Sequence, residues 1–323
     1  MTMLAAYAHA ISPDDPLSGL AVGQRPDPKP RDGWVNVTVK AASLNHHDLW
    51  TLKGVGISGD RLPMILGGDA AGVDEDGNEV VVHSVISTPG WTGDETLDPK
   101  RSLLSEVHDG TLSELVAVPR RNLVPKPVEM SFEEAACLPT AWLTAYRMLF
   151  VKARLTPGST VLVQGASGGV STAAVALAVA AGVRVWVTGR SEDKRKAALR
   201  LGAEQVFDVD ARLPERVDAV IDSVGEATWA HSLKALKPGG CIVTCGATTG
   251  PHPPADLNRV FFLQLQILGS TMGTRDELKQ MLSFLVASGL RPEIDSQIPL
   301  SRTHDGLHKM LIGDLRGKIV VTP

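Results

Sequence analysis

A glycine-rich turn between residues 161 and 171 is the clearest feature with chemical meaning. The segment V-L-V-Q-G-A-S-G-G-V-S places an apolar run before the turn and an Ala/Val-rich segment after it. Gly168 and Gly169 would let the backbone approach a pyrophosphate, whose charge the free N–H groups of the following helix stabilise. Ala166 and Ser171 replace two glycines of the usual dinucleotide-binding pattern, so a tight turn without a ligand is the alternative interpretation.

The residues after the next apolar run favour NADP over NAD. A carboxylate that binds the ribose 2′-hydroxyl of NAD normally follows the turn by about twenty residues. Gly189 stands there instead, and Arg190, Ser191, Lys194 and Arg195 follow it. A small residue leaves room for a 2′-phosphate, and the basic groups would neutralise its charge. The alternative is that these residues are only a solvated start of a helix.

The chain divides into two regions of different composition and hydrophobic pattern, and these patterns predict the elements that position the residues above. Residues 1–125 are rich in Gly, Pro and Asp, and alternating runs such as 34–40 and 79–83 predict a mostly β domain. From Ser131, which opens an S-x-x-E capping box, helical spacing through Leu149 predicts a helix. Strands are then predicted at 160–164, 183–188, 204–208, 217–222, 240–245, 264–271 and 318–321, and helices at 171–181, 192–201 and 275–288. Strand–helix alternation predicts an α/β fold with a doubly wound parallel sheet.

Composition excludes several classes of protein. A net charge of −4 gives no basic surface for nucleic acid or an anionic membrane. The three cysteines cannot build a disulfide framework, which favours a reducing compartment. The longest apolar run, Ala173 to Val183, is far shorter than the roughly 20 residues that span a bilayer, and no secretory signal is visible. We therefore expect a cytoplasmic protein with no membrane and no nucleic-acid partner.

An ordered set of short motifs resembles the zinc-free members of the medium-chain dehydrogenase/reductase superfamily, near the NADPH:quinone (enone) reductases. The motifs run from V-K-A-A-S-L-N-H-H-D-L at Val39, through A-A-C-L-P-T-A-W-L-T-A-Y at Ala135 and V-D-A-V-I-D-S-V-G at Val217, to G-K-I-V-V at Gly317. The resemblance implies a Rossmann dinucleotide-binding domain at 126–272, inserted into a GroES-like, mostly β catalytic domain formed by 1–125 and 273–323.

The same resemblance indicates that the catalytic zinc is missing. Zinc relatives hold the metal with a Cys, a His and a second Cys or Asp, and the matching positions here are Asn45, Gly68 and Thr140. Zinc requires thiolate, imidazole or carboxylate ligands, which none of these residues supplies. Residues 84–110 contain no cysteine, so a four-cysteine structural site is also absent. We predict no metal.

By resemblance, the catalytic residues follow the strand predicted at 34–40. Asn45 is expected beside the nicotinamide ribose and the substrate oxygen, and Asp48 is expected to orient the loop. His47 is the candidate proton donor, with water as the alternative. The predicted cofactor-binding residues are Asn45, Thr144, Ser167, Gly168, Gly169, Val170, Gly189, Arg190, Ser191, Lys194, Ser223, Val224, Gly246, Ala247, Thr248, Leu268, Ser270 and Lys318.

Without a metal, NADPH-dependent reduction of a quinone or an α,β-unsaturated carbonyl is easier chemistry than alcohol oxidation. Trp50, Trp91, Trp142 and Phe262 favour a small apolar or aromatic substrate, although a buried Trp is usually part of a core. Two alternatives stay open: an alcohol or aldehyde dehydrogenase of the same superfamily, and a cofactor-binding protein without turnover. The resemblance also implies a homodimer that pairs through the segment 264–271.

Overall fold

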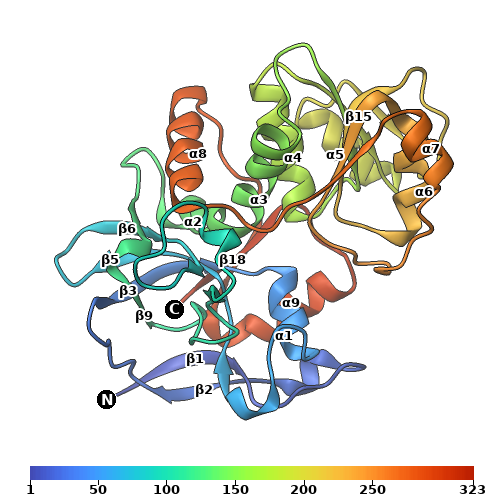
Figure 1. Cartoon of the computed structure of the whole chain (residues 1–323). Coiled ribbons are helices and arrows are strands. Elements are labelled where there is room, and N and C mark those ends of the chain that lie inside the picture. The colour runs from blue at the N-terminus through green and yellow to red at the C-terminus, as the bar shows by residue number, and fades with distance from the viewer. The chain divides into compact units, whose positions relative to one another are not determined.

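The computed structural model describes residues 1–323, which form two compact units (Figure 1). Unit 1 comprises Met1–Ala141, Gly273–Ala287 and Arg291–Pro323, and unit 2 comprises Trp142–Met272 and Ser288–Leu290. The chain divides after Ala141, whereas the sequence indicated a boundary after residue 125. The reason is that helix α2 (Phe132–Ala136) packs on strands β3 and β5 of unit 1.

Unit 1 is built around a seven-stranded sheet. Its path is β10-β6-β5-β3-β18-β17, and β9 also pairs with β3. The strands are β3 (Trp34–Ser43), β5 (Asp69–Asp74), β6 (Glu79–Val82), β9 (Leu115–Pro119), β10 (Leu123–Pro125), β17 (Ile294–Pro299) and β18 (Lys318–Thr322). The C-terminal strand β18 runs antiparallel to β3, with Val320 opposite Ser43. The end of the chain therefore completes a sheet that its first third begins.

Smaller elements complete unit 1. A three-stranded sheet has the order β2-β1-β4, and a two-stranded sheet joins β7 to β8. These strands are β1 (Thr2–Ala8), β2 (Leu20–Pro26), β4 (Met64–Ile65), β7 (Val85–Ile86) and β8 (Ser102–Leu103). The helices are α1 (His46–Leu52), α2, α8 (Arg275–Ser288, whose last residue belongs to unit 2) and α9 (Thr303–Leu311).

The core of unit 1 follows from the alternation along β3. Val35, Val37 and Val39 are buried, whereas Asn36 and Thr38 are more exposed, as the pattern at 34–40 predicts. Val37 and Val39 join a single cluster with residues of β5, β6, β9, α1, α9 and β18. The core is mainly Val, Leu and Ala because the chain has few aromatic residues.

Unit 2 contains a six-stranded sheet in the order β13-β12-β11-β14-β15-β16, in which every pair is parallel. The strands are β11 (Thr160–Gln164), β12 (Arg184–Thr188), β13 (Gln205–Phe207), β14 (Val217–Asp222), β15 (Leu236–Thr244) and β16 (Gln266–Gly269). The helices are α3 (Leu143–Tyr146), α4 (Gly169–Ala180), α5 (Glu192–Arg200), α6 (Glu226–Ala235) and α7 (Leu257–Phe262). The order reverses beside β11, which creates the switch point where α/β sheets bind ligands. The predicted doubly wound sheet is confirmed.

The helix that begins at Ser131 is the main departure from the predicted elements. The capping box is confirmed, because Ser131 Oγ accepts the Glu134 N–H and Glu134 Oε2 accepts the Ser131 N–H. Beyond α2, however, π-helical turns at Leu138–Trp142 and Arg147–Lys152 flank the single turn of α3. Pro139 lies in the first of these turns and has no N–H to donate, which disfavours regular α-helix there.

The helices are also too short or too polar for a bilayer. No helix combines the length and the apolar character that spanning a membrane requires.

Candidate functional site

A buried carboxylate ties the start of α1 to the turn before β5. Asp48 Oδ2 accepts the Asn45 N–H at 2.8 Å, and Asp48 Oδ1 accepts the Gly67 N–H at 2.9 Å. Asp48 is fully buried, and burial raises its pKa although these hydrogen bonds and the nearby cations oppose that rise. Both oxygens accept backbone N–H groups, and the loop-orienting role of Asp48 stays a prediction.

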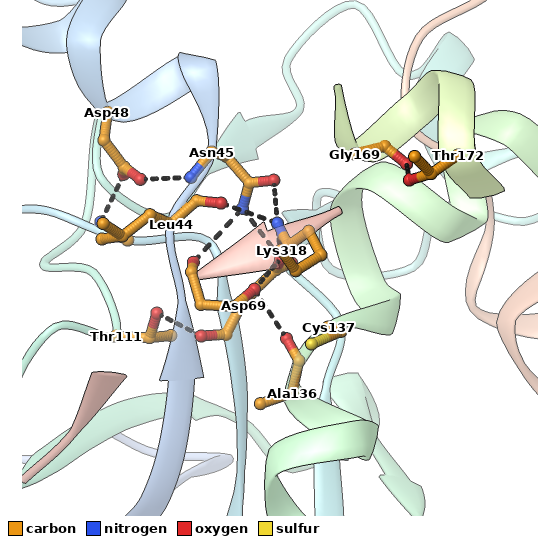
Figure 2. Close-up of polar contacts among 12 residues, drawn as sticks. Leu44, Asn45, Asp48, Asp69, Thr111, Ala136, Cys137, Gly169, Thr172 and Lys318 are labelled. Atoms are coloured by element: carbon orange, nitrogen blue, oxygen red, sulfur yellow. Dashed lines mark hydrogen bonds and ion pairs between the residues drawn. The ribbon is translucent and has the colours of Figure 1, made fainter. Parts of the chain in front are cut away.

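Asp69 and Lys318 form a buried ion pair beside this loop (Figure 2). The two side chains are 0% and 2% exposed, and Lys318 Nζ lies 3.1 Å from Asp69 Oδ2. Asp69 Oδ2 also accepts hydrogen bonds from Ser43 Oγ and Asn45 Nδ2, each at 2.8 Å. Lys318 Nζ further donates to the Leu44 carbonyl at 2.7 Å and to Asn45 Oδ1 at 2.6 Å. We call Ser43, Asn45, Asp69 and Lys318 the polar cluster.

The polar cluster fixes the orientation of the Asn45 amide. An ammonium only donates and a carboxylate only accepts, so Oδ1 must face Lys318 and Nδ2 must face Asp69. The second Nδ2 hydrogen reaches only the Ser43 carbonyl, at 3.4 Å. All three donors of Lys318 are used as well. The contacts predicted from Asn45 to substrate and from Lys318 to cofactor stay predictions, and each would require one of these bonds to be exchanged.

The positions that hold zinc in relatives lie together, but their side chains do not fit the metal. A Cβ on Gly68 would lie 3.5 Å from Thr140 Oγ1, so these two positions are neighbours in space. Gly68 has no side-chain ligand atom, and the Asn45 amide is already hydrogen-bonded to Asp69 and Lys318. Burial raises the pKa of the nearby Cys137 to about 12, and its thiol donates to the Glu133 carbonyl at 3.2 Å. No group of three His, Cys, Asp or Glu residues in the chain is arranged to hold a metal ion.

His47 forms a partly exposed pair with Glu106. His47 Nε2 lies 2.8 Å from Glu106 Oε1, and the side chains are 23% and 21% exposed. Burial lowers the pKa of His47, but the hydrogen bond to Glu106 and the charge of Asp48 outweigh it, and the net direction is upward. A Cβ on Gly56 would lie 2.6 Å from Glu106 Oε1, so the missing side chain makes room for Glu106. Nothing in the sequence around Glu106 indicated this pairing.

In unit 2 the predicted cofactor residues gather at the carboxyl edge of the parallel sheet. Gly168 caps α4, and Ser167, Gly169 and Val170 lie at the same helix start, directly after β11. The other predicted positions follow β12, β14, β15 and β16 or end those strands, except Thr144, which is buried on α3. Parallel strands place such loops along one edge, where a dinucleotide binds.

Asp222 is a buried residue that the sequence did not single out for this edge. Its Oδ1 accepts the N–H groups of Val224 and Gly225 at 2.8 and 3.0 Å. Its Oδ2 accepts the hydroxyls of Thr228 and Ser232, both at 2.8 Å. The carboxylate therefore fixes the loop after β14, where Ser223 and Val224 are predicted to bind the cofactor.

Comparison with known proteins shows the family. Residues 31–128 match the model of the alcohol dehydrogenase GroES-like domain, and residues 169–287 match the model described as zinc-binding dehydrogenase. The acryloyl-coenzyme A reductase of Metallosphaera sedula is 32% identical, over 94% of this chain and 96% of that protein. The chain belongs to the medium-chain dehydrogenase/reductase superfamily. It is an NAD(P)-dependent oxidoreductase with a GroES-like and a Rossmann-like domain.

Solved structures of the superfamily agree with this fold. An NAD-dependent alcohol dehydrogenase has a TM-score of 0.91 and 34% identity, and the match covers 99% of this chain and all of that one. A cobalt- and zinc-bound alcohol dehydrogenase from Pyrobaculum aerophilum has a TM-score of 0.91 and 28% identity, and the match covers both chains completely. The resemblance to the superfamily is confirmed, whereas its finer part, the likeness to quinone reductases, stays a prediction.

The polar cluster predicts a stability effect for Lys318→Met. The substitution leaves the Asp69 carboxylate buried without its counter-ion, and we expect the free energy of unfolding to fall by about 3–5 kcal/mol. Urea denaturation followed by far-UV circular dichroism measures the change. The matched double variant Asp69→Asn with Lys318→Met removes both charges and should lose less stability than Lys318→Met. Equal losses in the two variants would contradict the view that the unpaired charge causes the effect.

Proposed function

We propose that this superfamily member is a metal-free, NADPH-dependent reductase of α,β-unsaturated carbonyl compounds. The observation that carries the proposal is the polar cluster, which includes Asn45 at a position that the resemblance assigns to a zinc ligand. Asn45 there is bonded to Lys318 and Asp69, and the other two ligand positions are Gly68 and Thr140. Alcohol oxidation requires a strong Lewis acid or base at the alkoxide, whereas an activated alkene accepts hydride without one.

The activity for which a relative is named supports an acyl thioester as the substrate class. The Metallosphaera sedula relative is named for the reduction of acryloyl-coenzyme A, which is an α,β-unsaturated thioester. We extend that class to this chain and keep quinones as the second class, since both accept hydride at an electrophilic carbon. When bound, NADPH would supply the hydride that the electrophilic carbon accepts. The protein must then stabilise the enolate oxygen and deliver a proton to the α-carbon.

We assign the proton delivery to His47. Glu106 only accepts, so Nε2 of the imidazolium donates to it and the Nδ1–H is left for the substrate. The raised pKa keeps the imidazolium populated near neutral pH, which a general acid requires. Glu106 acts through His47 and is a positioning residue.

NADPH is proposed over NADH because of the residues after β12. Gly189 supplies no carboxylate to the 2′-hydroxyl, and Arg190 is exposed with no ion pair of its own. Ser191 caps α5 through a hydrogen bond of 3.4 Å from the Lys194 N–H to its Oγ, which directs the helix start toward this position. A helix N-terminus with adjacent basic side chains favours a phosphate.

A homodimer is proposed from the free edge of the unit 2 sheet. β16 pairs only with β15, and Gln266, Ile267 and Gly269 are exposed. Phe261 and Phe262 on the preceding helix α7 are 67% and 79% exposed. An edge strand with unpaired backbone groups beside exposed aromatic side chains supports pairing with a second copy.

The first test is turnover. Purified protein should oxidise NADPH in the presence of acryloyl- or crotonyl-coenzyme A or a short enone, and a chelator should leave the rate unchanged. Elemental analysis should find no stoichiometric zinc. Absorbance at 340 nm measures the rate across a panel that includes naphthoquinone and, in the reverse direction, primary and secondary alcohols. Alcohol oxidation that is lost together with a full zinc equivalent would contradict the proposal.

The pH dependence tests the role of His47. A group whose pKa is raised by a carboxylate keeps its proton below that pKa, so the rate should fall as pH rises through it. Glu106→Gln removes the hydrogen bond and the charge that raise the pKa, and the fall should move to lower pH. His47→Asn should lower kcat by about 10²-fold or more.

Rate–pH profiles of the three proteins provide the measurement. A merely structural Glu106 would lower the rate at every pH without moving the profile. That result would show that Glu106 does not set the pKa of the proton donor.

Assembly is tested by light scattering. The wild-type protein should have twice the mass of one 34.3 kDa chain at micromolar concentration. Ile267→Lys places a charge on the exposed edge and should shift the mass toward one chain. Val128→Lys, at an 88% exposed residue of unit 1, is the matched control and should stay dimeric. A wild-type mass of one chain would refute the dimer.

A further inference from the structure

A salt bridge crosses the segment where the cofactor ribose is expected. Arg195 Nη1 donates to the Gly189 carbonyl at 2.7 Å and forms an ion pair with Asp208 Oδ1. Asp208 directly follows β13, the edge strand that pairs with β12 and accepts the Gly189 N–H at the Phe207 carbonyl. The parallel pairing of the two strands therefore brings Asp208 next to Gly189, the residue expected beside the 2′ substituent of the cofactor ribose.

Gly189 itself is closely surrounded. A Cβ at this position would lie 3.0 Å from Ala166 Cβ and 3.1 Å from Arg195 Cγ, which is closer than ordinary contacts. The space that the sequence assigned to a 2′-phosphate is thus partly filled by the stem of Arg195. An aspartate could enter only if that stem moved, so Arg195 and an NAD-type carboxylate exclude one another here.

The two partners differ in their exposure to water. The Arg195 side chain is 18% exposed, whereas Asp208 is 74% exposed. An exposed ion pair contributes little to stability and can exchange partners at low cost. The guanidinium is therefore held at the ribose position, while its counter-ion is free to leave.

We propose that Asp208 determines how strongly the protein prefers NADPH, by neutralising Arg195 until a 2′-phosphate takes its place. The inference rests on the proposed use of NADPH, and it adds a residue that directly follows the edge strand β13. A phosphate bound beside Gly189 competes with the Asp208 carboxylate for the same guanidinium, and the carboxylate also repels it. A dinucleotide without the 2′-phosphate leaves the salt bridge intact.

Removal of the Asp208 charge is the direct test. In Asp208→Asn the dissociation constant of NADP⁺ should fall by about three- to tenfold, while that of NAD⁺ changes by less than about twofold. Arg195→Met should weaken NADP⁺ binding, and Asp208→Asn added to it should improve NADP⁺ binding by less than about twofold, because only the direct repulsion of the phosphate is then removed. Isothermal titration of the full chain with each nucleotide measures both constants, without a reducible substrate.

Asp210→Asn is the matched control, because it removes an equal charge two residues away. Asp210 lies at a φ of 62°, a conformation that asparagine tolerates, and makes no contact with Arg195. If Asp210→Asn has the same effect as Asp208→Asn, the inference fails, because general charge and not the salt bridge would explain it. If Asp208→Asn weakens NAD⁺ instead, Asp208 binds the ribose hydroxyls and the inference also fails.

Failure of the proposed function has a different signature. A wild-type protein that binds NAD⁺ more tightly than NADP⁺ would contradict the proposed cofactor. A selective gain of NADP⁺ affinity in Asp208→Asn would still support the role of Asp208.

Discussion

The Asp69 carboxylate and the Lys318 ammonium, 249 residues apart in the chain, lie together at a buried position in unit 1. Neither charge is tolerated there alone, because desolvation of an unpaired ion costs several kcal/mol. The pair therefore fixes the register of β18 against β3 and sets where the chain end must lie. Asn45, which caps α1, is held by both ions, so the pair and Asp48 together hold the start of the helix that carries His47.

The same contact limits the chemistry of unit 1. In a zinc enzyme the metal charge polarises a substrate oxygen, but here the ammonium spends its three donors on Leu44, Asn45 and Asp69. The cluster is close to neutral and offers no strong electrophile. Outside the cluster, the His47 side chain on α1 is 23% exposed and lies 2.8 Å from Glu106, and the proposed proton delivery rests on this pair. Reduction of an already activated alkene is the reaction that demands least of such a site.

The sequence predicts those structural features that depend on residues close together in the chain. The strands at 160–164 and 217–222 and the helix at 275–288 match the structure residue for residue, because hydrophobic period and turn residues are local signals. The sequence shows equally directly that Gly68 and Thr140 carry no thiolate, imidazole or carboxylate, whereas the absence of zinc stays a prediction. By contrast, the pairings of Asp69 with Lys318, Glu106 with His47 and Asp208 with Arg195 join residues of different elements that are distant in the sequence or on separate strands and helices. Which residues become partners depends on the order of the strands in each sheet, and the hydrophobic period of the sequence does not determine that order.

Two of these ion pairs show that burial determines whether an ion pair can exchange its partner. Lys318 and Asp69 are sealed from water, so their attraction is strong and exchange of either partner would strand a charge. Arg195 and Asp208 make the same kind of contact, but water screens the mostly exposed carboxylate and lowers the cost of replacing it. A buried ion pair such as Asp69 with Lys318 stabilises the fold and does not exchange its partners. A screened pair at the edge of a nucleotide-binding sheet can give way to a ligand of the same charge.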